Sequence, residues 1–177
     1  MVSFDVSVGR LERARAFVGL EVRVTEETLF QEAPGLARAC AAVKEGLPHR
    51  VMPVETAVVT GTAGEDGAFS YFMGDEVEPG GAKVREALAS AEGLVLRELP
   101  AGTLVARVPV RFSLQAGVAM KAARIRAYIH GEWLAENGYR IAQGLGIQDI
   151  ELYHYRRRRF RQARKMVMEL AFPIEKV

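Results

Sequence analysis

The feature of this sequence that most constrains its fold is a repeated order of secondary-structure elements. In the first 79 residues, the alternation of apolar and polar side chains predicts two strands, then a helix, then two more strands. The predicted strands are residues 3–11, 13–24, 55–61 and 68–78, and the helix lies between Thr25 and about Gly46. This first half therefore has the order strand, strand, helix, strand, strand.

Two details of the first helix follow from single residues. Thr25 is predicted as its N-cap, but Thr28 is not expected to complete a capping box, because that position usually holds Glu or Gln. The helix is expected to break at Ala33-Pro34-Gly35 and to resume at Leu36, since proline removes a backbone donor and clashes with the preceding turn.

The same order returns after Pro79-Gly80-Gly81, the expected joint between the halves 1–79 and 80–177. The predicted strands here are 94–99, 103–112, 147–155 and 165–173. A long helix is predicted over about 114–143, with a possible interruption at Asn137-Gly138. The sequence thus predicts an α+β fold in which residues 1–177 form one domain of two similar units. Such a pair would have pseudo-two-fold symmetry and a central groove, which is the expected ligand site.

Composition narrows the class of protein. The chain has 177 residues, of which 49% are hydrophobic and 26% charged, as in an ordinary globular protein. Cys40 is the only cysteine, so neither an intrachain disulfide nor a cysteine-based metal site can form. The N-terminus lacks the pattern of a secretion signal, and no stretch approaches the ~18 apolar residues of a membrane span. A cytoplasmic protein without a membrane contact is expected.

The charge is unevenly distributed along the chain. The net charge is +2, with 24 basic residues against 22 acidic ones. Seven of the basic residues form one run: Arg156, Arg157, Arg158, Arg159, Arg161, Arg164 and Lys165. Two interpretations stay open for this run, a solvated hairpin connection and a contact with nucleic acid or with an acidic protein. With only Phe160 interleaved, the run offers no stacking platform for single-stranded nucleic acid.

The hexapeptide from Ile150 to Tyr155 carries the strongest functional signal. Because strand side chains alternate between faces, Glu151, Tyr153 and Tyr155 are predicted to share one face, and Ile150 and Leu152 the other. A carboxylate beside two phenols suits a cavity for a large, flat, often cationic organic molecule. The alternative is an edge strand with its polar face in water.

Further aromatic residues are candidates for the walls of such a cavity. Trp133 and Tyr139 are both predicted on the long helix. Because they are six residues apart, they do not share one face of it, so at least one of them is expected to pack in ordinary core. Tyr71 shares a strand face with Phe69, and this face could equally be the buried side of the sheet. Glu151, Tyr153, Trp133, Tyr139, Tyr71 and Phe69 form the predicted ligand-binding set.

Other chemistries lack their signatures. His49, His130 and His154 show no spacing of metal ligands, so neither a metal nor another cofactor is expected. No Gly-x-Ser-x-Gly motif is present, and Gly61-Thr62-Ala63-Gly64 lacks the Gly-Lys-Ser/Thr that completes a phosphate loop.

Several segments together resemble a known family. These are residues 99–106, the helix with Tyr128, Trp133 and Tyr139, then Ile150-Glu151-Leu152-Tyr153, then residues 169–174. They are similar to the GyrI-like family, also described as the effector-binding domain of bacterial transcription activators. The resemblance is clearest over roughly 94–175 and fainter in the first half, and no single motif in it is highly specific.

The resemblance implies a duplicated, SHS2-like fold with a central cleft for bulky hydrophobic, frequently cationic compounds, and it places the family's acidic residue at Glu151. The chain has no spare length for a helix-turn-helix, so a stand-alone member is expected. Three functions stay open: small-molecule capture in drug or toxin sensing, hydrolysis of ring-strained toxins by Glu151 with Tyr153 and Tyr71, and contact with gyrase, DNA or an acidic protein through the basic run. The run is more basic than the family's usual polar hairpin.

Overall fold

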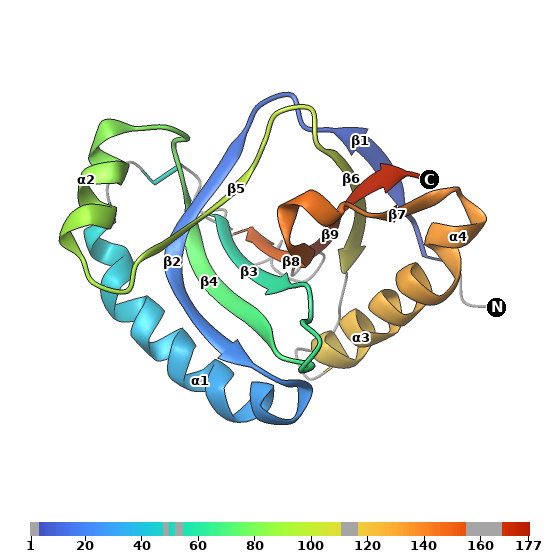
Figure 1. The fold of residues 1–177 in the computed structure, drawn as a ribbon, viewed down its shortest axis with the longest axis horizontal. Coiled ribbons are helices and arrows are strands. Elements are labelled where there is room, and N and C mark those ends of the chain that lie inside the picture. Colours follow the sequence, from blue (N-terminus) through green and yellow to red (C-terminus); the bar gives the residue numbers. More distant parts are fainter. Residues whose placement is uncertain (1–3, 48–49, 52–54, 111–116, 155–167) are drawn as a thin grey trace, which may run out of the picture.

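Nine strands of the described residues form one antiparallel sheet (Figure 1). A computed structural model describes residues 4–47, 50–51, 55–110, 117–154 and 168–177. The strands are β1 (Ser7–Arg10), β2 (Arg15–Val24), β3 (Glu55–Gly61), β4 (Phe69–Val77), β5 (Val95–Leu99), β6 (Leu104–Val110), β7 (Tyr139–Ile141), β8 (Ile147–His154) and β9 (Met168–Lys176). Eight of them fall at the predicted segments within a few residues, and β7 was not predicted.

The strand order joins the two halves of the chain. Along the sheet it is β1-β6-β9-β8-β3-β4-β2-β5, and β7 pairs with β9 beside this path. The first strand of each half therefore lies against the second strand of the other half: β1 pairs with β6, and β5 pairs with β2. Strands β3 and β8, one from each half, meet at the centre of the sheet.

Helix α1 (Glu26–Val43) is continuous, which corrects both predictions made for it. Pro34 lies inside the helix without breaking it. The capping box is complete, because the backbone N–H of Thr25 donates to Oγ1 of Thr28 at 2.9 Å, and the N–H of Thr28 donates to Oγ1 of Thr25 at 3.4 Å. The box needs an acceptor at this position, and a threonine hydroxyl supplies one.

The long helix of the second half ends earlier than predicted. Helix α3 (Val118–Tyr128) continues as a π-helical turn (Ile129–Trp133) and as α4 (Leu134–Glu136). The chain then turns at Gly138, whose φ of 69° is readily adopted by glycine, and enters β7. Asn137-Gly138 thus ends the helix instead of interrupting it.

Helix α2 (Ala82–Ser90) was not predicted. It follows the Pro-Gly-Gly joint directly, and its Val84 packs in a small cluster with Val18 and Leu47. Val84 and Leu88 are four residues apart and so lie on one side of this helix, toward the cluster.

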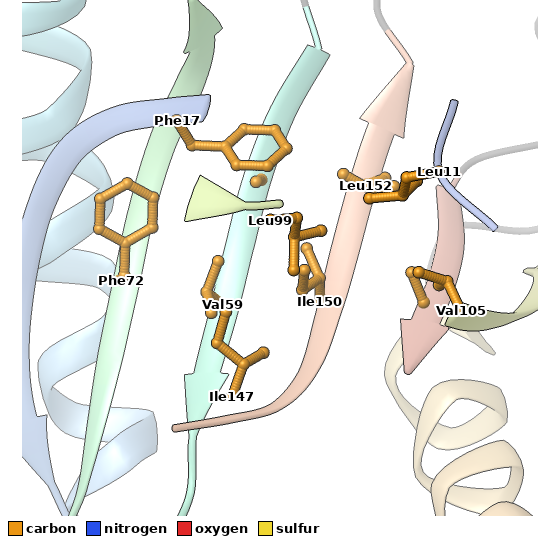
Figure 2. Packing of buried hydrophobic residues seen from close by; sticks show 11 residues of the cluster. Leu11, Phe17, Val59, Phe72, Leu99, Val105, Ile147, Ile150 and Leu152 are labelled. Carbon is orange, nitrogen blue, oxygen red and sulfur yellow. The ribbon is translucent and has the colours of Figure 1, made fainter. Parts of the chain in front are cut away.

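One core cluster fills the inner face of the curved sheet (Figure 2). Because the sheet bends, β5 at one end and β6, next to the other end, both contribute to the cluster. Its members are Leu11, Phe17, Ala57, Val59, Phe72, Leu99, Val105, Ile147, Ile150, Leu152 and Ala171. Ile150 and Leu152 are 0% and 2% exposed, as their predicted face requires.

A second cluster lies on the opposite face, beneath α3. Ile125 and Ile129 pack there against side chains of β6 and β9, among them Val108, Leu170 and Phe172. All five are at most 1% exposed. This packing fixes the position of α3 relative to the centre of the sheet and hence the direction of its polar side chains.

Candidate functional site

Helices α1 and α3 lie on the same face of the sheet. The ammonium of Lys44, just after α1, is 3.6 Å from Oδ1 of Asp75 on β4, while Arg126 of α3 contacts Glu151 on β8. Asp75 is paired with Thr56, and Thr56 with Tyr153, so the three side chains point to one face. Glu151 shares this face because it is two residues from Tyr153. Helix α1 packs on β2 and β4 and α3 on β6, with β3 and β8 between them (Figure 1).

The centre of this face carries a cluster of charged side chains. Nε and Nη2 of Arg126 donate to Oδ2 and Oδ1 of Asp149 at 3.0 and 2.7 Å. Nη2 also donates to Oε1 of Glu151 at 2.8 Å. The hydroxyl of Tyr153 donates to Oε2 of Glu151 at 2.7 Å. We call Arg126, Asp149, Glu151 and Tyr153 the central cluster.

The members of the central cluster differ in exposure. The side chain of Asp149 is only 2% exposed, that of Glu151 15% and that of Arg126 29%. Burial alone would lower the pKa of Arg126, but the hydrogen bonds and negative charges of Asp149 and Glu151 outweigh it and hold that pKa above its usual range. Two carboxylates face one guanidinium, so the four residues keep one negative charge uncompensated.

Tyr71 borders the central cluster. On β4 it is paired with Thr60, which is paired in turn with Asp149 on β8, so Tyr71 and Asp149 lie on the same face two strands apart. Burial raises the pKa of Tyr71 to about 12, and the negative charge of Glu151 acts in the same direction. Tyr71 and Tyr153 are both half-buried. The structure therefore brings Glu151, Tyr153 and Tyr71 of the predicted set together.

This shift of Tyr71 predicts a loss of stability at high pH. The folded protein holds the proton up to about pH 12, whereas an ordinary tyrosine releases it near pH 10. The contribution of Tyr71 is therefore complete below pH 10 and is lost as the pH rises toward 12, by about 2 kcal/mol in the free energy of unfolding. Urea unfolding across this range should show the loss in wild type and much less of it in Tyr71→Phe. An equal loss in both proteins would contradict the assignment, and Tyr128→Phe serves as the control.

His130 lies beside the central cluster on the π-helical turn. Its Nε2 is 3.4 Å from Nε2 of Gln148, and its ring meets that of Phe172 edge-on at 5.6 Å. Burial lowers the pKa of His130, although the charge of Asp149 opposes this effect. Among the described residues, no group of three His, Cys, Asp or Glu side chains is arranged to hold a metal ion.

Trp133 and Tyr139 pack together, away from Glu151. Their rings are stacked, with centroids 5.7 Å apart and an interplanar angle of 7°, at the edge of the cluster beneath α3. Tyr139 is paired with Lys176, whereas Glu151 is paired with Leu170, six residues earlier on β9. Six residues of strand span roughly 20 Å. The structure therefore gives this pair a packing role and does not bring it to the central cluster.

Phe69 lies in a different part of the same face. It is paired with Val24 at the start of β4 and is 8% exposed. It borders an open hollow of about 470 Å³ at the N-terminus of α1. The other residues around this hollow are Thr25, Glu26, Glu27, Ala63, Asp66 and Gly67. Phe69 is thus separated from Glu151, although it is only two residues from Tyr71.

Two predicted features lie outside the described residues. These are Tyr155, expected on the face of Glu151, and the basic run with Arg156, Arg157, Arg158, Arg159, Arg161, Arg164 and Lys165. Both stay predictions. Within the part of the chain that is described, no helix has the length and apolar character to cross a membrane.

Two members of the central cluster, Asp149 and Arg126, were not predicted from the sequence. Asp149 could have been found, because it precedes Glu151 by two residues and must share its face if the strand begins early enough. Arg126 left no comparable signal, since nothing in the spacing of α3 tells which strand its side chain will reach. Only the packing of Ile125 and Ile129 on the sheet sets that direction.

Comparison with known proteins identifies solved structures with a similar fold. No protein-family model and no curated protein matches the sequence. Among solved structures, SAV2435 bound to tetraphenylphosphonium is similar with a TM-score of 0.65 and 15% identity, over 97% of this chain and 94% of that one. The C-terminal domain of EcmrR is similar with a TM-score of 0.61 and 15% sequence identity, over 99% of this chain and 100% of that domain. EcmrR in a complex with DNA is similar with a TM-score of 0.60 and 14% sequence identity, over 98% of this chain but only 58% of the EcmrR chain. These neighbours confirm at the level of the fold the GyrI-like resemblance seen in the sequence.

Proposed function

We propose that this protein, whose fold is that of a GyrI-like domain, binds bulky hydrophobic organic cations at the central cluster. The observation that carries the proposal is the partly exposed carboxylate of Glu151 between the hydroxyl of Tyr153 and the neighbouring Tyr71. Aromatic faces attract a delocalised cation, and the excess negative charge of the central cluster orients it. That a protein of the same fold has been solved with tetraphenylphosphonium supports this class of ligand.

The proposal extends from the site to its use in the cell. Binding without turnover fits the sensing or sequestration of drugs or toxins in the cytoplasm, and the likeness to a domain of EcmrR, solved bound to DNA, supports a link to transcription regulation. Hydrolysis would need Tyr153 to donate its hydroxyl proton to the opening ring, but Tyr153 donates this single proton to Glu151. This observation favours binding over hydrolysis. A contact with gyrase, DNA or an acidic protein through the basic run is a separate prediction.

Replacing Glu151 with glutamine is the direct test. The variant keeps the shape of the side chain and removes its charge, so it should bind tetraphenylphosphonium roughly tenfold more weakly, which corresponds to about 1.4 kcal/mol. Binding of the neutral triphenylphosphine oxide should be unchanged. Isothermal titration calorimetry on both proteins measures the two affinities. Equal affinity of wild type and Glu151→Gln for the cation would refute the role of Glu151.

Glu169→Gln is the matched control. Glu169 lies on the neighbouring strand β9 and is paired with Leu152, so it points to the opposite face of the sheet from Glu151. Its substitution removes the same charge from the protein at a similar position along the sheet. Tetraphenylphosphonium affinity should therefore stay at the wild-type value in this variant.

We also propose that the two halves are duplicated units related by a pseudo-two-fold axis. Exchanging β1 with β5, β2 with β6, β3 with β8 and β4 with β9 turns the strand order into its own reverse. An axis between β3 and β8 would have this effect, and α1 and α3 would exchange with each other. On this proposal the central cluster lies beside the axis, where the expected groove between the halves would be.

A further inference from the structure

Glu151 already has a cationic partner inside the protein. Its Oε1 accepts from Nη2 of Arg126 at 2.8 Å, and its Oε2 accepts from the hydroxyl of Tyr153 at 2.7 Å. A positively charged ligand that approaches Glu151 therefore meets a carboxylate whose charge is shared with a guanidinium. The ligand has to compete with Arg126 for this carboxylate.

Arg126 has a second anchor that does not depend on Glu151. Its Nε and Nη2 both donate to Asp149, at 3.0 and 2.7 Å, in the two-bond geometry that guanidinium and carboxylate groups favour. The side chain of Asp149 is 2% exposed, so this pair is shielded from water on the carboxylate side. If the bond to Glu151 breaks, the guanidinium stays paired with Asp149 and is not left as an isolated charge.

We propose, on the basis of the function proposed above, that Arg126 is the resident cation of the site and sets its selectivity. A ligand cation takes over Glu151 from Arg126, while Asp149 retains the guanidinium. Exchanging one cation for another at Glu151 returns only part of the free energy of the new ion pair, because the pair with Arg126 is lost as the new one forms. Most of the affinity must then come from the apolar surface that the ligand buries. The site should thus accept cations with a large apolar surface and reject compact ones.

The test compares three ligands by isothermal titration calorimetry: tetraphenylphosphonium, the compact cation tetramethylammonium, and the neutral triphenylphosphine oxide. It uses wild type, Arg126→Gln and the double variant Arg126→Gln/Asp149→Asn. Both variants should bind tetraphenylphosphonium roughly tenfold more tightly than wild type does, since a charge-assisted hydrogen bond no longer has to be broken. Tetramethylammonium should gain at least as much, and triphenylphosphine oxide should not change.

The double variant separates competition from simple electrostatics. It removes one positive and one negative charge, so the net charge of the central cluster is the same as in wild type. It also avoids leaving the buried Asp149 without its guanidinium, which could unfold the single variant. Tighter cation binding in the double variant therefore means that Glu151 has been released. Arg124→Gln, an exposed residue of the same helix, removes an equal charge and should leave every affinity unchanged.

Two results would overturn the inference. If wild type binds tetraphenylphosphonium and the double variant binds it no more tightly, Arg126 does not compete with the ligand, and the proposed function stands without the inference. If neither wild type nor any variant binds an organic cation, the proposed function fails and the inference fails with it. Binding that is seen only in the variants would support the inference, because Arg126 then blocks the site in wild type.

Discussion

Gly19→Ala is expected to lower the free energy of unfolding by about 3 kcal/mol, because a β-carbon at this position has no room. Gly19 on β2 is paired with Gly74 on β4, and an added β-carbon would lie 2.0 Å from the carbonyl oxygen of Met73 and 2.4 Å from Cα of Gly74. Both atoms belong to the backbone, so the two strands would have to separate. Urea unfolding followed by circular dichroism measures the change.

Gly9→Ala is the control for this effect. Gly9 also lies in a strand, β1, but an added β-carbon there meets nothing within 4 Å. The substitution should leave the free energy of unfolding within about 0.5 kcal/mol of wild type. If Gly19→Ala were equally harmless, the close approach of β2 and β4 at this position would be wrong.

Phe72→Ala is expected to cost about 3–5 kcal/mol, since it leaves a large cavity in the core of the inner face. Phe72 is 0% exposed and packs with side chains of β2, β3 and β8, as Figure 2 shows. Its neighbour Tyr71 points to the opposite face, toward the central cluster. The variant should therefore lose stability in urea while the folded protein still binds tetraphenylphosphonium with wild-type affinity.

Phe30→Ala tests whether this cost comes from burial. Phe30 lies on α1 and is 82% exposed, so removing its ring should change the free energy of unfolding by no more than about 0.5 kcal/mol. A loss of several kcal/mol in Phe30→Ala would mean that this ring is covered in solution. Weakened ligand binding by folded Phe72→Ala would show instead that the inner core and the central cluster are coupled across the sheet.

The two faces of β8, and with them half of the central cluster, could be predicted from alternation alone. Strand side chains must point to opposite faces in turn, so once Ile150 and Leu152 are assigned to the core, Glu151 and Tyr153 have to point the other way. The same rule located eight of the nine described strands. It works because it needs only local geometry and no knowledge of which elements will meet.

The helices were less predictable because tertiary contacts override local signals in them. Pro34 is tolerated within α1, which is fixed on the sheet by Leu36 and Cys40, both at most 5% exposed. Helix α2 follows a Pro-Gly-Gly segment that by itself indicates only a joint. The rule about proline therefore predicted a break that α1 does not have, and α2 was missed although Val84 and Leu88 have helical spacing.

The sequence alone was enough to place Glu151 and Tyr153 on one face of a strand, whereas the packing of the whole chain set which charges and aromatic rings meet them. Glu151 and Tyr153 lie two residues apart on one strand and are hydrogen-bonded to each other, and the alternation of side chains alone puts them on the same face. The contact with Arg126 spans 25 residues and depends on where α3 packs, as the burial of Asp75 at 0% depends on Thr56 and Arg50 reaching it from elsewhere in the chain. Charge interactions act through space, and a sequence pattern orders residues only along the chain.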